Sequence, residues 1–303
     1  MLSLAIQAVQ LSTYMNENCV IPCRISEERE KTVREYTKAL LDQAHMIGDH
    51  GLEKGEFHQS GLFRSAVERI RGTMSASMKD KREFVKAVLD CLVKHSFIVG
   101  WKSAESTDRH DYEVEHQDRR ITAIETKGCL DGNNTNIFVR PPNADEFVIW
   151  SLCQNAAADP RHNAWSGIHT RLGAEMIVSK QKIDALIIWD MLCGTIARPC
   201  PKLASRQRAT DVGPYSVPPP CVYLFPRTIP DPRNNPVPDP MRLADVSFAS
   251  VLYRAFRCQE DEIHSVRIRT KRKGADLVRQ TCIEADNQIL RESAWTRLRR
   301  SGA

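Results

Sequence analysis

One apolar run constrains the fold of this chain more than any other feature. Residues 185–189 read Ala-Leu-Ile-Ile-Trp, with no polar residue between them. A run of this kind is typical of a strand that is buried on both faces of a sheet. A helical pattern over residues 165–178 precedes it. Together they predict an α/β fold, in which helices flank a mixed central β-sheet.

The first hundred residues show helical rather than strand periodicity. Ser26 followed by Glu27 and Glu28 is a helix-capping pattern, and apolar residues then recur at helical spacing. The predicted helices cover 26–46, 61–74 and 79–94. This part of the chain is therefore predicted to be a helical region.

The rest of the chain mixes helical and strand patterns around a proline-rich segment at 199–240. A helix is predicted after Pro141-Pro142, and it contains Phe147 and Trp150. The remaining predicted elements are a strand at 221–225, a helix at 246–256, a strand at 264–270 and a basic helix or helix pair at 275–299.

The net charge of +5 is concentrated near the C-terminus. From Arg254 onward the sequence has twelve Lys or Arg against seven Asp or Glu, including the run Lys271, Arg272 and Lys273. Such clusters favour a polyanion, because phosphate contacts dominate the affinity of proteins for nucleic acids. A solvated helix followed by a polar tail explains the same charges equally well.

Neither a membrane-spanning segment nor a signal peptide is predicted, so we expect a cytoplasmic protein with no membrane partner. The chain has 10 cysteines, and scattered cysteines in a cytosolic protein are usually reduced and buried. Cys19 and Cys23 have three residues between them, whereas Cys193 and Cys200 have six, which is poor spacing for zinc ligands. Whether the cysteines bind a metal stays open.

Two short strand patterns, 112–115 and 121–126, flank a polar turn and predict a β-hairpin. Because strand side chains alternate, Glu125 and Lys127 point to the same face. Asp111 stands at the start of the first strand, across from Glu125 or Lys127. It joins their face if the turn has an odd number of residues.

Two carboxylates and one ammonium on one face suit the hydrolysis of a phosphodiester. Mg²⁺ prefers oxygen ligands, and a positive group near the phosphate stabilises the charge that develops during the reaction. Asp111, Glu125 and Lys127 provide this set. Glu113, expected opposite Ile124, is the alternative first acid. In the contrary interpretation these residues are exposed charges on a surface hairpin.

The acid on the first strand and Glu125-Thr126-Lys127 on the second, with helices before and after, resemble the PD-(D/E)xK nuclease superfamily over about residues 80–190. The resemblance implies a restriction-endonuclease-like core, with helical N-terminal and mixed C-terminal additions. It also implies that Asp111 and Glu125 bind Mg²⁺, with Thr126 in the same metal site. Lys127 would assist the attacking water.

Two further positions bear on this resemblance. Many members of the superfamily carry a glutamate on the helix before the hairpin, and here Glu83 is favoured, with Glu68 as the alternative. His110 stands directly before Asp111, where the family often has a proline. The sequence departs from the family pattern at that position.

The resemblance also suggests how the chain divides into regions and what biochemical function it has. The predicted parts are an N-terminal helical region at 1–78, a catalytic core at 79–198 and a proline-rich, basic C-terminal region at 199–303 that contributes to DNA binding. The implied function is that of a type II-like restriction endonuclease, a homodimer that cuts double-stranded DNA at a specific sequence with Mg²⁺. The alternatives are a repair or recombination nuclease without strict sequence specificity, and a non-enzymatic DNA-binding protein.

Polar and basic residues outside the hairpin are candidates for contact with DNA. The candidates are Asn133, Asn134, Arg140, Arg161, Asn163, Arg171, Lys271, Arg272 and Lys273. Asp184 and Asp190, at the two ends of the apolar run, either support the site or cap neighbouring elements.

Overall fold

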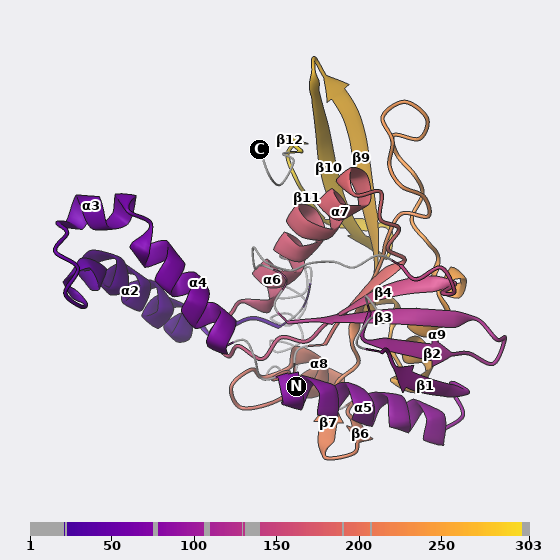
Figure 1. Cartoon of the computed structure of the whole chain (residues 1–303). Helices are drawn as coiled ribbons and strands as arrows, with labels where there is room; N and C mark the ends of the chain where they lie inside the picture. Colours follow the sequence, from indigo (N-terminus) through magenta and orange to yellow (C-terminus); the bar gives the residue numbers. More distant parts are fainter. Residues whose placement is uncertain are drawn as a thin grey trace, which may run out of the picture. The chain divides into compact units, whose positions relative to one another are not determined.

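The computed structural model describes residues 21, 23–74, 78–105, 110–128, 130, 140–189, 191–206 and 208–298. The chain forms two compact units, both drawn in Figure 1. Residues 25–86 form one unit, and residues 1–24 together with 87–303 form the other. Every strand that the structure describes belongs to the second unit.

The unit of residues 25–86 is helical, as predicted. Its elements are α2 (Glu27–Gln43), the 3-10 turn η1 (Ala44–Met46), α3 (Lys54–Gln59), α4 (Leu62–Met74) and the first part of α5 (Met78–Lys94). Ser26 caps α2, because its hydroxyl oxygen accepts a hydrogen bond from the Arg29 backbone N at 3.3 Å.

The apolar side chains of this unit remain largely exposed. No residue of α2 is buried, and Tyr36 is 70% exposed. The exposed apolar side chains are Val33, Tyr36, Leu41, Met46, Ile47, Leu62, Val67 and Ile70. The helical spacing of apolar residues thus predicted the helices correctly, but it did not indicate what packs against them.

A mixed sheet dominates the other unit, with ten strands in the described part of the chain (Figure 1). The strand order is β1-β2-β3-β4-β5-β8-β9-β10-β11, and β12 pairs with β10. Neighbours are parallel from β3 to β5 and between β8 and β9, and otherwise antiparallel. The strands are β1 (Gly100–Ser103), β2 (Tyr112–Glu115), β3 (Ile121–Lys127), β4 (Glu146–Ser151), β5 (Ala185–Ile188), β8 (Cys221–Leu224), β9 (Ile263–Lys273), β10 (Asp276–Ala285), β11 (Gln288–Glu292) and β12 (Thr296–Arg297).

The helix predicted after Pro141-Pro142 is wrong, because Phe147 and Trp150 lie in strand β4. All residues of β4 are buried, and the strand pairs in parallel with both β3 and β5. A fully buried strand has a continuous apolar sequence, which periodicity alone cannot distinguish from a buried helix. The same pattern at residues 185–189 was interpreted correctly, and β5 confirms it.

The basic helix or helix pair predicted at 275–299 is also wrong, because this segment forms β10, β11 and β12. Asp286 and Asn287 make the turn from β10 into β11 with φ values of 48° and 58°. Two successive residues with positive φ are typical of tight hairpin turns. The strands predicted at 221–225 and 264–270 are confirmed by β8 and β9, and the helix predicted at 246–256 by α9 (Ser247–Ala255).

Three successive helical segments cover one face of the sheet (Figure 1). They are α6 (Pro160–Ser166), the π-helical segment η2 (Gly167–Leu172) and α7 (Gly173–Val178). Their buried side chains, such as Ile168 and Met176, belong to one core cluster with Phe147 and Ile149 of β4. This helical layer corresponds to the helix predicted at 165–178.

Helix α9 covers the opposite face. Phe248 lies against Trp150 with ring centroids 5.8 Å apart, and Phe256 lies against Trp189 with centroids 4.5 Å apart. Helices therefore flank the sheet on both faces, which confirms the predicted α/β class. Among the described helices, none is both long enough and apolar enough to cross a membrane.

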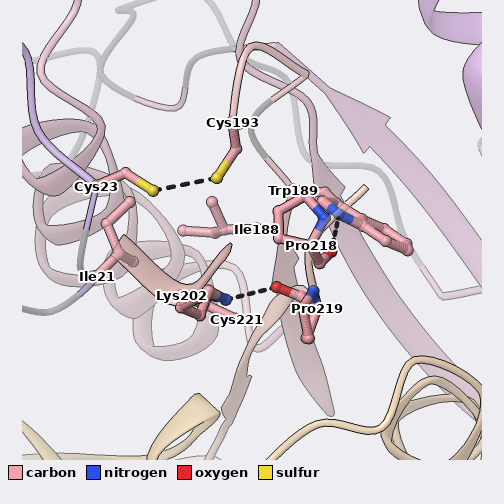
Figure 2. A pocket seen from close by; sticks show the side chains of 9 residues that line it. All are labelled: Ile21, Cys23, Ile188, Trp189, Cys193, Lys202, Pro218, Pro219 and Cys221. Carbon is pink, nitrogen blue, oxygen red and sulfur yellow. Dashed lines mark hydrogen bonds between the residues drawn. The ribbon is translucent and has the colours of Figure 1, made fainter. Parts of the chain in front are cut away.

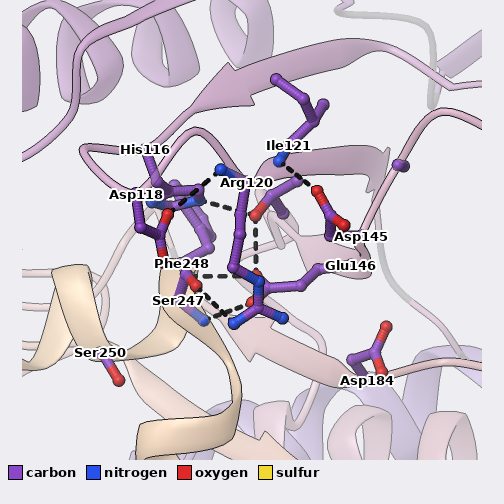
Figure 3. Close-up of polar contacts among 12 residues, drawn as sticks. His116, Asp118, Arg120, Ile121, Asp145, Glu146, Asp184, Ser247, Phe248 and Ser250 are labelled. Atoms are coloured by element: carbon purple, nitrogen blue, oxygen red, sulfur yellow. Dashed lines mark hydrogen bonds and ion pairs between the residues drawn. The ribbon is translucent and has the colours of Figure 1, made fainter.

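The buried carboxylate of Glu146 joins α9 to the sheet (Figure 3). Its Oε1 accepts a hydrogen bond from Ser247 N at 2.5 Å, and its Oε2 accepts one from Phe248 N at 3.2 Å. Thr122 Oγ1 donates to Oε2 at 2.7 Å, and the Arg120 guanidinium lies 3.1 Å from Oε1. Glu146 thus supplies acceptors for a helix start whose first N–H groups have no partner within the helix.

Candidate active site

The β2–β3 hairpin sets the register of the candidate residues. Residues 116–120 form the turn, an odd number, and Tyr112 pairs with Ile124. The Asp111 backbone N donates to the Ile124 carbonyl oxygen at 2.9 Å. The paired register ends at Tyr112 and Ile124, and Asp111 lies directly before it. The turn has the odd number of residues that was expected, whereas the placement of Asp111 on the face of Glu125 and Lys127 stays a prediction.

Three charged groups meet at the end of this hairpin. Lys127 Nζ forms an ion pair with Glu125 Oε1, and the two side chains are only 12% and 4% exposed. Asp111 Oδ2 accepts two hydrogen bonds, from Thr126 N at 2.7 Å and from Thr126 Oγ1 at 2.6 Å. Thr126 therefore orients the Asp111 carboxylate through both its backbone and its hydroxyl.

Glu125 has the most perturbed carboxyl group of the three. Burial raises its pKa to about 7, Lys127 opposes this rise, and the nearby charge of Asp111 adds to it. Two carboxylates beside one ammonium leave an excess of negative charge in a site that excludes most water. A divalent cation would relieve this excess, so the donor set fits a hard cation with oxygen ligands.

Glu113, the alternative first acid, has a different environment. It lies opposite Ala123, not Ile124 as expected. Lys102 Nζ lies 2.8 Å from its Oε2, and Asn143 Nδ2 donates to its Oε1 at 3.2 Å. The hydrogen bond from Lys102 holds the pKa of Glu113 below its ordinary value. A carboxylate already paired with an ammonium is a poorer cation ligand, so this geometry favours Asp111.

His110, which stands where the resembling family often has a proline, is buried beside Glu113. Its side chain is 2% exposed, and Nε2 lies 3.2 Å from Glu113 Oε1. The histidine therefore packs into the base of the hairpin directly before Asp111. The departure from the family pattern leaves the position of Asp111 intact.

Both candidates for a fourth acid lie in the helical unit of residues 25–86. Glu83 Oε1 lies 3.8 Å from Lys79 Nζ on α5, and Glu68 Oε1 lies 3.3 Å from Arg64 Nε on α4. Each pair has the spacing of four residues that is common for ion pairs on exposed helix surfaces. A catalytic role for either glutamate stays a prediction.

Two of the residues that we considered for DNA contact, the half-buried Arg140 and the buried Asn163, make hydrogen bonds within the protein. Arg140 donates through Nε to the Ala144 carbonyl oxygen at 2.9 Å and lies 3.5 Å from Asp184. Asp184 Oδ2 in turn accepts a hydrogen bond from Phe147 N at 2.8 Å. Arg140 and Asp184 therefore fix the start of β4. Of the two roles considered for Asp184, this contact corresponds to capping a neighbouring element.

The other DNA-contact candidate that makes hydrogen bonds within the protein is Asn163. Its side chain is 1% exposed, and its Oδ1 accepts a hydrogen bond from Leu130 N. Arg161 pairs with Asp159, and its side chain is partly exposed, as is Arg171. The remaining calls in this region, Asn133, Asn134 and Asp190, lie outside the described residues.

The three basic candidates near the C-terminus are exposed. Lys271, Arg272 and Lys273 form the end of β9, and the β9–β10 hairpin extends as a long ribbon in Figure 1. Lys271 Nζ lies 3.8 Å above the ring of Trp295, in a cation–π contact. The positive end of this hairpin is thus available to a polyanion.

A second basic cluster was not predicted from the sequence. Arg291 of β11 stacks on Trp165 at 4.3 Å, and His169 lies parallel to the same indole at 5.3 Å. Burial, together with Arg279 and Arg291, lowers the pKa of His169 to about 4, so this histidine is neutral. The cluster joins α6 and η2 to β10 and β11, and it could not be predicted while residues 275–299 were assigned to a helix.

Compared with known proteins, the chain matches no family model, no curated protein and no solved structure. The resemblance to the PD-(D/E)xK superfamily therefore rests on the residues of this chain alone. It enters the functional interpretation as a hypothesis.

Proposed function

We propose that this protein is a Mg²⁺-dependent endonuclease of the type II restriction class, acting on double-stranded DNA. The observation that carries the proposal is the ion pair between Lys127 and the buried Glu125, with the Asp111 carboxylate held nearby by Thr126. Two acids and an ammonium at one point are the groups that phosphodiester hydrolysis requires.

Each residue has a distinct task in the proposed reaction. Asp111 and Glu125 would hold Mg²⁺, with Thr126 fixing the orientation of Asp111. When bound, Mg²⁺ supplies a Lewis acid for the phosphate and lowers the pKa of a bound water. Lys127, held by Glu125, places its ammonium where it neutralises charge on the phosphate and orients the attacking water.

The fold supports the proposal in part. Helix α5, the β2–β3 hairpin, helices α6 to α7 and the parallel strand β5 follow one another in the predicted order, and β1 adds a strand that was not predicted. Strand β4 departs from this order, because it replaces the helix that we expected after Pro141-Pro142. A restriction-endonuclease-like core is therefore proposed on the strength of the site rather than of the complete topology.

DNA is the substrate that the charge distribution favours. The exposed Lys271, Arg272 and Lys273 at the end of β9 offer a strand ribbon of the kind that can enter a DNA groove or follow a phosphate backbone. We propose that the active form is a homodimer, because a twofold axis matches a palindromic site. The exposed apolar side chains of the 25–86 unit are compatible with such an association.

A digest of phage DNA distinguishes the proposal from its two rivals. Purified protein with Mg²⁺ is expected to give discrete fragments, whose number follows the frequency of the recognition sequence. A continuous smear would favour a repair or recombination nuclease without strict specificity. Intact DNA that is shifted in a native gel would favour a binding protein without catalysis.

The raised pKa of Glu125 predicts how cleavage depends on pH at limiting Mg²⁺. Protonation competes with the cation below pH about 7, so apparent Mg²⁺ affinity is expected to fall up to about tenfold per pH unit there and to level off above it. The Mg²⁺ concentration for half-maximal cleavage, measured between pH 5.5 and 8.5, checks this expectation. A pH-independent value would contradict Glu125 as a ligand.

A further inference from the structure

Three cysteines that are distant in the sequence meet in the larger unit. Cys23, Cys193 and Cys200 are all buried, and their Sγ atoms lie within 4.8 Å of one another. The Sγ atoms of Cys23 and Cys193 are 3.2 Å apart, and Figure 2 shows these two side chains pointing toward each other. The long separation along the chain is why sequence spacing gave no signal for this cluster.

The distances suit a metal held by thiolates. Zn²⁺ binds cysteine sulfur at about 2.3 Å with tetrahedral geometry, which places the sulfur atoms of a site roughly 3.8 Å apart. The observed sulfur separations, from 3.2 Å to at most 4.8 Å, lie on both sides of that value. Movements of well under an ångström would therefore turn this cluster into three corners of a tetrahedron.

The loop that carries two of the cysteines is built to hold them. Gly194 has φ +87° and donates from its N to the Arg198 carbonyl oxygen at 3.0 Å, and Cys193 forms a β-bridge with Arg198. Arg198 is fully buried and donates to the Asn155 carbonyl oxygen at 2.7 Å. The tight loop thus brings Cys193 and Cys200 together before any ligand binds.

A small cavity and a buried positive charge lie beside the thiols. The cavity has a volume of ≈ 20 Å³ and is lined by Cys23, Cys193, Cys221 and Lys202 (Figure 2). That volume is sufficient for a single water molecule. Zn²⁺ with three thiolates would carry one net negative charge. The buried Lys202 ammonium lies 3.8 Å from Cys221 Sγ and pairs with Glu262 at 3.6 Å, so part of its charge is already balanced by that carboxylate.

We propose that Cys23, Cys193 and Cys200 bind one Zn²⁺ ion, with a water molecule as the fourth ligand. The three thiols lose their protons to solvent when the ion enters. Bound zinc would fasten the segment around Cys23 to the loop after β5. This site shares no residue with the proposed Mg²⁺ site. The donor atoms also differ, because soft thiolates select zinc and hard carboxylates select magnesium.

The zinc content of the full chain, purified with a thiol reductant and without chelator, tests the proposal. Elemental analysis is expected to find about one zinc per chain, and Co²⁺ substitution is expected to give the intense sulfur-to-metal charge-transfer absorption of a thiolate site. Both readouts are independent of DNA cleavage, so the zinc site and the nuclease can fail separately.

Single substitutions identify the ligands. Cys193→Ser and Cys200→Ser are each expected to weaken zinc binding by more than about 100-fold. Cys258→Ser and Cys282→Ser, which alter buried cysteines outside the cluster, are expected to keep the wild-type zinc content. If the cluster variants do not fold, the cobalt spectrum of the wild-type chain still shows whether thiolates bind the metal.

Three results would overturn the proposal. The first is a folded, reduced wild-type chain that takes up neither zinc nor cobalt from solution. The second is zinc that the cluster variants retain in full. The third is a disulfide between Cys23 and Cys193 as the stable state of the protein under the reducing conditions of the assay.

Discussion

Lys127→Ala is expected to lower Mg²⁺-dependent cleavage of DNA by about 100-fold or more, while the fold stays intact. The ammonium lies beside Glu125 in a site from which most water is excluded, so its loss removes positive charge where negative charge develops. Glu125→Gln is expected to have at least the same effect, because the amide is a weak ligand for Mg²⁺. The initial rate of DNA cleavage at saturating Mg²⁺ measures the effect of each substitution.

The control for these variants lies on the same hairpin. Glu115→Gln removes one carboxylate at the exposed end of β2 and is expected to leave the cleavage rate within about twofold of wild type. Circular dichroism and thermal unfolding establish that each variant is folded. Full cleavage by folded Lys127→Ala or Glu125→Gln protein would show that the hairpin is not the active site.

The largest expected loss of stability comes from Glu146→Ala. The substitution leaves the Arg120 guanidinium without its buried partner and removes the acceptors for Ser247 N and Phe248 N at the start of α9. A buried donor left without an acceptor typically costs about 1–3 kcal/mol of unfolding free energy, and the substitution leaves two such backbone N–H groups. Urea denaturation followed by circular dichroism measures this loss.

A matched control removes a glutamate from an exposed ion pair. Glu292 pairs with Arg269 at 3.3 Å, and its side chain is 38% exposed. Glu292→Ala is expected to change the unfolding free energy by less than about 1 kcal/mol. Equal effects of the two substitutions would mean that Glu146 does not hold α9 on the sheet.

Local patterns predicted much of this fold because they are set by neighbouring residues. The cap at Ser26, the helix around α9 and the fully apolar strand β5 follow from spacing and composition alone. Strand β4 shows the limit of such patterns. Its apolar sequence is compatible with a helix, and only its position between β3 and β5 decides that it is a strand.

In the candidate site, too, some features follow from local sequence patterns and others depend on the complete fold. The common face of Glu125 and Lys127 follows from the alternation of side chains along one strand, whereas Asp111 lies just outside the paired register. The roles of Thr126 and His110 depend on side-chain contacts that no spacing reveals. The meeting of Cys23 with Cys193, 170 positions apart, depends on the complete fold.

The antiparallel pairing of β5 with β8 has a consequence for how this protein can be dissected. Through it, one hydrogen-bonded sheet runs from the strands of the hairpin to the basic ribbon of β9 and β10. A fragment ending at residue 198 would leave the apolar β5 as an open edge, which is a template for aggregation. The proposed catalytic hairpin and the proposed DNA-binding ribbon are therefore parts of one continuous sheet, so cutting the chain between them is expected to disrupt both.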